Sequence, residues 1–427
     1  MERYLKLENI EIALGGQVNL PSAEELQKAL SDAETDLFIG RGVISDELLT
    51  AGWFLYSVAS ARKSLELYSA PRQRRAYQLS SHIFDLATQN GIEDINQELS
   101  LTFAAQVGFL KGDLNPNATA VYRRLNERDS TIEINDENLA LKVGVMFLAM
   151  DRQRLFRVLP YLREKLATFN TGSEGRLGLL SLLLDSCWSL LLYVSYGDNG
   201  AYQDALTSLE SVVRSDVALE DIDLRWVAAH LLDAASDFGD SSVWAMLPPD
   251  VPPEAARAMT LGNPAVLSLW PPQVQLIKSE DANNPLLLGT KRLFLSIPTS
   301  AGKTLLAQYI SLAHLAQDGG GICFVAPTHS LCREIRKSLS DRLRLLKQEV
   351  AEEAPIGIWN MFDDDIEIDD TTSTSVEVIT PERLAFMLRH KPKETLEKFK
   401  LFIVDEAHLI SEESRGLGLE STLSLLH

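Results

Sequence analysis

The chain has 427 residues, of which 45% are apolar and 23% are charged, and its formal net charge is −20. This length predicts two or three domains, and the composition is typical of a soluble globular protein. So large an acidic excess excludes a protein that coats nucleic acid through its overall charge. The three cysteines, Cys187, Cys323 and Cys332, lack metal-ligand spacing and cannot form a disulfide framework. We therefore expect a reducing compartment, with Cys323 and Cys332 in the core.

Two segments bear on localisation. The first residues, MERYLKLENIEIAL, are charged and lack the apolar core of a signal peptide, which indicates a cytoplasmic protein. The most apolar segment, LLSLLLDSCWSLLLYV, is interrupted by Asp185 and is short for a bilayer. We interpret it as a buried helix and expect no membrane partner.

Residues 1–245 are predicted to form an acidic α-helical domain. From about residue 45 to residue 239, apolar side chains recur at spacings of three and four, as on helices. The segments are faintly similar to tetratricopeptide hairpins but have no regular period, so we expect an irregular helical array. The first 260 residues carry a net charge of −14, which disfavours binding to a phosphate backbone. We expect this region to dock a protein partner; the alternative is that it only braces the rest of the chain.

A proline-rich linker is expected over residues 246–268, because four prolines in MLPPDVPPEAAR cannot lie inside a helix. Beyond it the segments RLFLSI, GICFVAP, VEVIT and KLFIVDE are short and apolar, and each is followed by a helix-compatible stretch. This alternation predicts parallel βαβ units over residues 269–427. The expected fold class is thus α + α/β.

One predicted helix of this second part, SLCREIRKSLSDRLRLLK, is strongly amphipathic. Its apolar stripe comprises Leu331, Ile335, Leu339, Leu343 and Leu346. We expect its six basic residues to lie on a solvated face, and a track for nucleic acid is the alternative.

The segment SIPTSAGKT, residues 296–304, ends like a phosphate-binding loop. In such a loop, backbone N–H groups wrap the phosphates at a helix N-terminus, a lysine reaches the β- and γ-phosphates, and a hydroxyl binds Mg²⁺. Lys303 and Thr304 fit these two roles. Ile297 stands where the first glycine of the usual pattern would be, so this motif alone leaves a chance match open.

The segment KLFIVDEAHLI strengthens the case for a nucleotide site. Its apolar strand ends in Asp405 and Glu406, which places two carboxylates at the C-terminal edge of the sheet, beside the phosphate loop. One carboxylate can hold Mg²⁺ while the next orients and deprotonates the attacking water.

Together these segments resemble superfamily 2 DExH-box helicases, most like the Ski-like branch. Six segments occur in the order of that family: LWPPQVQLI, PTSAGKT, APTHSLCREI, TPERL, VDEAH and RGLGLESTLSLL. They are similar to the Q-motif region, motifs I, Ia, Ib and II, and the segment that follows motif II. The resemblance covers residues 269–427 and implies a RecA-like P-loop domain that uses ATP and Mg²⁺.

The resemblance also implies roles for individual residues. Gln273 would read the adenine, and the nucleotide loop would comprise Pro298, Thr299, Ser300, Ala301, Gly302, Lys303 and Thr304. Thr304 and Asp405 would hold Mg²⁺, with Lys303, Asp405 and Glu406 as the catalytic residues and Glu406 as the base. His408 would couple hydrolysis to the nucleic-acid side. The phosphates of one DNA or RNA strand would lie along Pro327, Thr328, Thr380, Pro381 and Arg383, without regard to sequence.

The family's motifs III to VI and its second RecA-like domain are not found in these 427 residues. We expect the chain to be the N-terminal portion of a longer protein, or to receive that domain in trans. Three functions stay open. The first is an ATP-dependent helicase or translocase, with DNA favoured over RNA. The second is the motor of an anti-phage defence or restriction complex that recruits an effector nuclease, since the layout resembles Hachiman helicases. The third is a nucleotide-sensing scaffold without unwinding activity.

Overall fold

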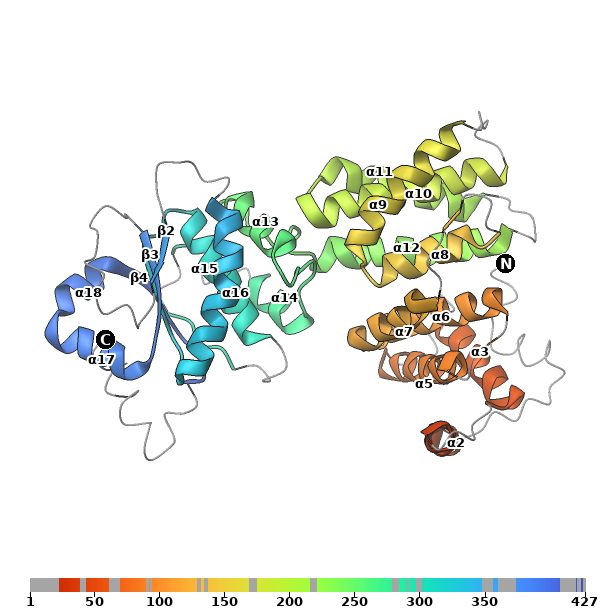
Figure 1. Ribbon diagram of the computed structural model, residues 1–427, viewed down its shortest axis with the longest axis horizontal. Coiled ribbons are helices and arrows are strands. Elements are labelled where there is room, and N and C mark those ends of the chain that lie inside the picture. Colours follow the sequence, from red (N-terminus) through yellow and green to blue (C-terminus); the bar gives the residue numbers. More distant parts are fainter. Residues whose placement is uncertain are drawn as a thin grey trace. The chain divides into compact units, whose positions relative to one another are not determined.

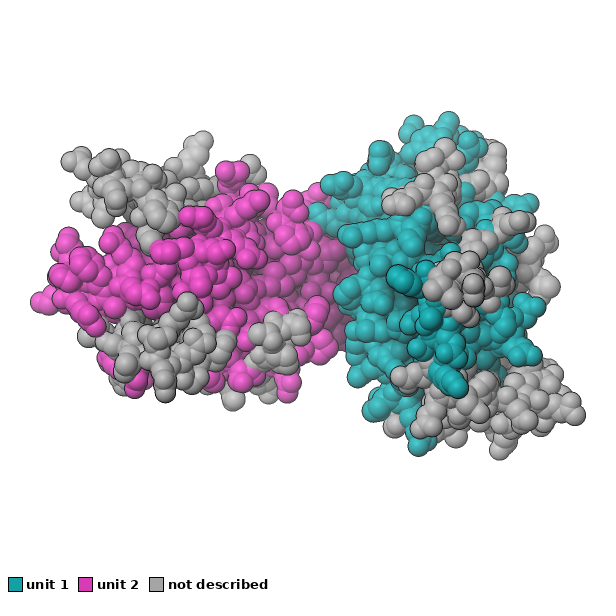
Figure 2. Space-filling view, turned by 60° about the horizontal axis from the view of Figure 1, so that its bottom comes forward, with its two compact units in different colours: residues 1–191, 200–235 teal, residues 192–199, 236–427 magenta. Residues whose placement is uncertain are grey.

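The structure is a computed structural model, and two compact units can be distinguished in it. Unit 1 comprises residues 1–191 and 200–235, and unit 2 comprises residues 192–199 and 236–427 (Figure 2). The structure describes residues 23–38, 44–60, 70–89, 92, 94–128, 132–133, 137–168, 175–215, 221–278, 284–289, 292–296, 302–347, 356–359, 374–407, 420 and 424.

Unit 1 is built from helices in all its described elements (Figure 1). The helices are α2 (Ala23–Phe38), α3 (Asp46–Ser60), α5 (Ala70–Gln89), α6 (Ile95–Lys111), α7 (Asn115–Arg128), α8 (Leu139–Leu148), α9 (Arg152–Thr168), α10 (Arg176–Tyr196), α11 (Asn199–Arg214) and α12 (Ile222–Ser241). The last residues of α10 and α12 belong to unit 2. The ten described helices are 10 to 21 residues long, and this variation fits an irregular array.

The core of unit 1 is centred on α6 and α8. Helix α8 is buried along its whole length, and α6 is buried over most of its turns, so both are surrounded by other helices. Helices α5 and α6 approach closely at Gly108, where a Cβ atom would lie 2.0 Å from the Ser81 hydroxyl oxygen. Glycine is therefore required there by contact between the helices rather than by its backbone angles.

Helix α10 is long and apolar enough to cross a membrane by length and composition, the one such helix among the described residues. Its most apolar window is 56% buried inside the protein. Leu183, Leu184 and Cys187 are fully buried, while Asp185 accepts a hydrogen bond at 2.5 Å from Nε of Arg163. The predicted buried helix is confirmed, because this pattern is that of a core helix with one polar edge.

Unit 2 contains a parallel sheet of four strands in the order β2-β3-β1-β4. The strands are β1 (Gly321–Val325), β2 (Ile356–Trp359), β3 (Thr374–Ile379) and β4 (Phe399–Val404). The helices are α13 (Pro253–Leu261), α14 (Pro271–Ile277), α15 (Lys303–Ala316), α16 (His329–Lys347), α17 (Pro381–His390) and α18 (Pro392–Lys398). A mostly helical protein with a small parallel sheet is the architecture that the sequence predicted, and it is consistent with a RecA-like helicase domain.

The sheet lies between two layers of helices, with α15 and α16 on one side and α17 and α18 on the other (Figure 1). Side chains of β1 alternate between these layers, because successive residues of a strand point to opposite faces. Ile322 packs in the cluster that includes residues of α15 and α16, and Phe324 packs against α16. Cys323 and Val325 pack against α17. Both faces are thus covered, as parallel sheets require.

Two sequence expectations need correction in unit 2. The predicted strand RLFLSI is wrong over residues 292–296, which form no regular element. Phe294 there is 84% exposed, so its apolar pattern does not reflect burial in a sheet. The segment expected to be a proline-rich linker contains α13 instead, with Pro253 at its first position, and Ala255, Ala256 and Met259 in the core. Proline is compatible with a helix start, because that position needs no N–H donor.

Candidate functional site

The described parts of the predicted nucleotide site meet at the C-terminal edge of the sheet. The Asp405 N–H donates to the Val325 carbonyl at 2.9 Å, and the Ala326 N–H donates to the Ile379 carbonyl at 3.0 Å. These bonds continue the pairing past the ends of β4, β1 and β3, and so bring the residues that follow the three strands to one edge. In parallel α/β sheets this is the edge at which ligands bind.

Helix α15 begins at Lys303, directly after the phosphate-loop segment. Gly302 precedes it with φ of +71°, a left-handed conformation that disfavours side chains. A Cβ atom there would also lie 2.7 Å from Nε2 of Gln273. The backbone geometry and this close approach both explain why glycine stands before the lysine. Ile297, Pro298, Thr299, Ser300 and Ala301 lie outside the described residues.

The hydroxyl of Thr304 and the carboxylate of Asp405 are in contact, although 101 residues separate them. Thr304 Oγ1 donates to Asp405 Oδ2 at 3.2 Å. Mg²⁺ prefers oxygen ligands, and it usually takes one or two from the protein and others from phosphates and water. The two oxygen atoms suit such an ion, while the described residues contain no group of three or more His, Cys, Asp or Glu side chains that would form an all-protein metal site.

Glu406 follows Asp405 with φ of +54°, in the left-handed region. Its N–H donates to Asp405 Oδ1 at 2.9 Å, so the turn after β4 is held by the aspartate side chain. Non-glycine residues in this conformation cost about 1 kcal/mol or more and occur often at active sites.

Gln273 is the residue assigned to adenine by resemblance, and it is 1% exposed. Its Oε1 accepts from the Trp270 N–H at 2.9 Å, and its Nε2 donates to the Gly302 carbonyl at 3.1 Å. The residue therefore connects the start of α14 to the phosphate-loop segment. Its contact with Gly302 places it next to the residue that precedes Lys303, and its role toward adenine stays a prediction.

The residues expected along a nucleic-acid strand follow β1 and β3. Thr328 is exposed, and its hydroxyl caps α16 by accepting from the Leu331 N–H at 3.2 Å. Pro327 and Pro381 are half-buried, while Arg383 is exposed. Thr380 is only 6% exposed, so its side chain offers little surface to a strand. His408, expected to couple hydrolysis to this side, lies outside the described residues.

Behind the site is a buried polar network that the sequence did not reveal. Arg342 of α16 is fully buried, contrary to the expected solvated face for the basic residues of this helix. Its Nε donates to Oε1 of Gln308 on α15 at 3.1 Å, and its Nη atoms donate to the carbonyls of Ala258, Met259 and Pro264 at 3.3, 3.0 and 2.8 Å. Burial lowers the pKa of this guanidinium.

A sequence pattern could have identified Arg342. It lies three residues after Leu339 and four before Leu346, so it shares the face of the apolar stripe. Ile335, Leu339, Leu343 and Leu346 are buried as expected, and Leu331 is half-buried. Cys187, Cys323 and Cys332 are also buried and free, and burial raises the pKa of each thiol.

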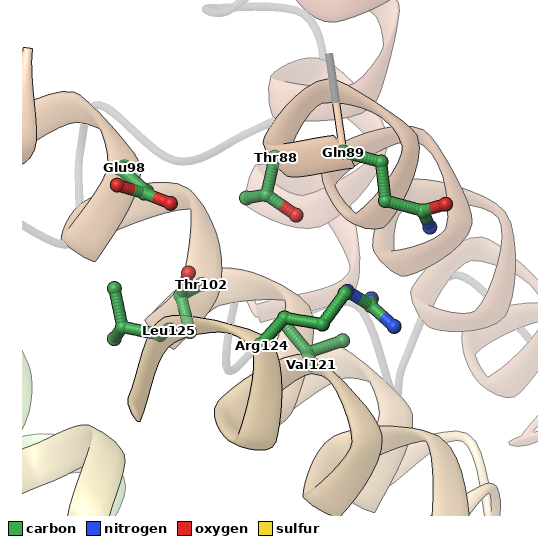
Figure 3. A pocket seen from close by; sticks show the side chains of 7 residues that line it. All are labelled: Thr88, Gln89, Glu98, Thr102, Val121, Arg124 and Leu125. Carbon is green, nitrogen blue, oxygen red and sulfur yellow. The ribbon is translucent and has the colours of Figure 1, made fainter. Parts of the chain in front are cut away.

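A separate hollow of about 250 Å³ lies within unit 1 (Figure 3). It is lined by side chains of α5, α6 and α7: Thr88, Gln89, Glu98, Thr102, Val121, Arg124 and Leu125. Arg124 is paired with Asp85, and the Thr88 hydroxyl donates to the Asp85 carbonyl at 2.8 Å. The Arg124–Asp85 pair joins α7 to α5, the Thr88 bond lies within α5, and we assign the hollow no function.

The chain resembles known proteins in two different ways. Residues 280–427 match the family described as DEAD/DEAH box helicase. The chain is 26% identical over 295 residues to the Hachiman protein HamB of Bacillus cereus, which covers 66% of this chain and 25% of HamB. It is 31% identical over 156 residues to the ATP-dependent DNA helicase Hel308 of Thermococcus kodakarensis, covering 36% of this chain and 12% of that protein. For Hel308 of Pyrococcus abyssi the identity is 29% over 153 residues, with 36% and 19% covered.

The chain therefore spans a quarter or less of the lengths of these relatives. The match to HamB differs from the others in extent. It covers two thirds of the chain, which is more than residues 280–427 provide, so it includes residues before position 280. The Hel308 matches cover about as many residues as the helicase segment itself contains.

Proposed function

We propose that the chain is the ATP-binding part of a nucleic-acid motor, a helicase or translocase, because residues 280–427 match the DEAD/DEAH box helicase family. The observation that carries the proposal is the contact of Thr304 Oγ1 with Asp405 Oδ2 at 3.2 Å. It joins the residue after the P-loop lysine to the first carboxylate after β4, as a site for Mg²⁺ and nucleotide phosphates requires.

The roles of the residues follow from their positions. Lys303 at the start of α15 would contact the phosphates together with backbone N–H groups of the helix N-terminus. Thr304 and Asp405 would hold Mg²⁺, which supplies charge stabilisation to the transferred phosphoryl group. Glu406 would orient the attacking water and accept its proton. A second RecA-like domain, in cis or in trans, would complete the site on closure.

Two substitutions in the complete protein separate nucleotide binding from hydrolysis. Lys303→Ala removes a charge-assisted contact and is expected to lose binding of a fluorescent ATP analogue. Glu406→Gln is expected to bind ATP and leave it unhydrolysed. Lys337→Ala, which changes an exposed lysine of α16, is the matched control and should bind and hydrolyse normally. Equal loss of nucleotide binding in the Lys303 and Glu406 variants would contradict the proposed base.

DNA is the proposed substrate in preference to RNA, and the observation that favours it is the similarity to the DNA helicase Hel308. We propose a cytoplasmic motor that contacts strand phosphates through Pro327, Thr328, Pro381 and Arg383, with Thr380 contributing backbone. ATPase stimulation by a DNA strand and by an RNA strand of the same sequence would test this preference. Stronger stimulation by the RNA would reverse the assignment.

A second proposal concerns the biological role and rests on the extent of the HamB match, which includes residues before the helicase domain. We propose that the protein is the motor of an anti-phage defence complex whose helical unit 1 docks a protein partner, such as an effector nuclease. Plaque counts on a phage-sensitive host that carries the complete system would test the role. Protection should vanish in the Glu406→Gln variant; protection that persists would favour a nucleotide-sensing scaffold.

A further inference from the structure

The outer face of α17 carries Arg383, Phe386 and His390, here called the α17 face, in which Phe386 lies next to each of the other two. Phe386 is 52% exposed. It stacks on the His390 ring with centroids 4.1 Å apart and planes at 27°, and the Arg383 guanidinium carbon lies 5.8 Å from the Phe386 centroid. The spacing of three and four residues places all three on one side of the helix.

The opposite side of α17 packs against the sheet. Leu384, Ala385 and Leu388 are buried, and Leu384 and Leu388 pack against residues of β1, β3 and β4. Phe386 contributes nothing to that core, so the fold does not need an aromatic residue there. His390 is held in place because its Nδ1–H donates to the Phe386 carbonyl at 2.9 Å. The Phe386 ring is thus held against the His390 ring with Arg383 over it, and about half of Phe386 stays open to solvent.

The position of this face relates it to the proposed site. Helix α17 begins at Pro381, one residue after Thr380, at the sheet edge where Asp405 and Thr328 follow β4 and β1. Arg383 lies in the first turn, and His390 is the last residue of the helix. The α17 face therefore runs from near the sheet edge back along the sheet for about 10 Å of helix, at a rise of about 1.5 Å per residue.

Local charge favours an anionic occupant. Residues 380–400 contain six basic residues, Arg383, Arg389, Lys391, Lys393, Lys398 and Lys400, and three acidic ones, Glu382, Glu394 and Glu397. Glu377, just before this segment, pairs with Lys398 at 2.6 Å, and with Glu377 counted the net charge is still positive, whereas the whole chain carries −20. A positive surface beside exposed aromatic rings is the combination that binds single strands, in which bases stack on rings and basic groups contact phosphates.

We propose that the α17 face is a stacking platform for an unpaired base of the bound strand. This proposal rests on the motor function proposed above and adds a base contact to a track that is otherwise expected to touch phosphates only. The base would stack on the part of the Phe386 ring that His390 leaves open, and the Arg383 guanidinium, which now lies over the ring at 5.8 Å, would turn to the adjoining phosphate. Every base has a flat face, so the contact would not select a sequence.

The test uses the complete protein and a labelled single-stranded DNA, with binding measured by fluorescence anisotropy. Phe386→Ala is expected to weaken binding by about 5- to 150-fold, the effect of removing one base–aromatic stack. Phe386→Tyr keeps a ring and is expected to bind like the unchanged protein. Tyr161→Ala is the matched control, because Tyr161 is 50% exposed with Lys165 5.8 Å from its ring centroid, but lies on α9 of unit 1.

A second measurement separates stacking from loss of structure. The labelled strand is prepared with one abasic nucleotide, moved along its length. The unchanged protein should lose affinity at one position, and Phe386→Ala should lose nothing further at that position. If Phe386→Ala binds the strand as tightly as the unchanged protein does, the stacking platform is overturned. If that variant instead loses binding of a protein partner, the α17 face is a docking surface. If the unchanged protein binds no strand while it still binds ATP, the motor proposal fails as well.

Discussion

The side-chain amide of Gln273 donates a hydrogen bond to the carbonyl of Gly302 at 3.1 Å, and its carbonyl accepts one from the Trp270 N–H at 2.9 Å. The same Gly302 carbonyl accepts the Leu306 N–H, which begins the hydrogen bonding of α15. Gln273 thereby fixes the residue next to Lys303 from a different part of the chain. The position of Gly302 thus depends on a residue that lies outside the phosphate-loop segment.

Gln273→Met should therefore weaken both stability and nucleotide binding. The substitution keeps the volume of the side chain but leaves the Trp270 N–H without its partner, at a cost of about 1–3 kcal/mol of unfolding free energy. Affinity for a fluorescent ATP analogue should fall by about fivefold or more, as expected for one lost hydrogen bond. Chemical denaturation and titration measure the two effects. Gln275→Met, on the exposed side of the same helix, should change stability by less than about 0.5 kcal/mol.

The left-handed backbone at Glu406 predicts an unusual response to glycine. Glycine adopts φ of +54° without a steric cost, so Glu406→Gly should leave the unfolding free energy unchanged or raise it by up to about 1 kcal/mol. ATP hydrolysis should be lost at the same time. In Glu397→Gly, on helix α18, the same replacement should cost about 1 kcal/mol. A similar loss of stability at both positions would show that the turn is not strained.

His230 predicts a loss of stability in acid. Its Nε2 lies 2.8 Å from the Tyr56 hydroxyl, and burial lowers its pKa to about 4. The ordinary pKa is about 6.5, so between these values the unfolded chain binds more protons than the folded one. The contribution of neutral His230 to the unfolding free energy is complete above about pH 6.5. It is lost as the pH falls toward 4, and its total is about 3 kcal/mol.

Urea unfolding between about pH 7.5 and pH 4.5 measures this effect. His230→Gln cannot titrate, so its unfolding free energy should vary less with pH over this range. Part of the variation should persist, because burial also lowers the pKa of His82 and His314. An unchanged pH profile in the variant would contradict the assignment to His230.

Arg342 and Arg344 lie on the same helix and should respond very differently to replacement. Arg342→Met leaves the carbonyls of Ala258, Met259 and Pro264 without their donor, which we expect to cost about 3–5 kcal/mol. Arg344 is exposed, so Arg344→Met should cost less than about 0.5 kcal/mol. Thermal unfolding of both variants measures the difference. Equal costs would mean that the buried network contributes little.

Sequence patterns predicted those strands and helices whose apolar residues follow the period of the element. Strands β1, β3 and β4 are short apolar runs followed by turns, and their patterns reflect real burial. The run Leu293–Phe294–Leu295 has the same composition, yet Phe294 is 84% exposed. A strand forms only where a neighbouring strand can pair with it, and a short apolar run does not encode that neighbour.

For the candidate site, the sequence identified the residue types but not the distant contacts. Lys303, Thr304, Asp405 and Glu406 were found because their motifs are contiguous. The partners of Arg342 could not be found in this way, because the carbonyl of Pro264 lies 78 residues away and any residue has a carbonyl. Backbone acceptors have no sequence signature. The predicted domain boundaries stay predictions.

The buried guanidinium of Arg342 also determines whether residues 280–427 can be exchanged as a separate module. The match to the helicase family begins at residue 280, yet Arg342 donates to the carbonyls of Ala258, Met259 and Pro264. In turn, the Thr260 hydroxyl donates to the Ser195 carbonyl at 2.8 Å, and the Tyr193 and Ser242 hydroxyls are 2.9 Å apart. A chimera joined at residue 280 would lose the native segment that holds the carbonyls of Ala258, Met259 and Pro264. The positive charge of Arg342 would then be buried without these acceptors. Grafts between such helicases should therefore be cut where hydrogen bonds end, upstream of where sequence similarity ends.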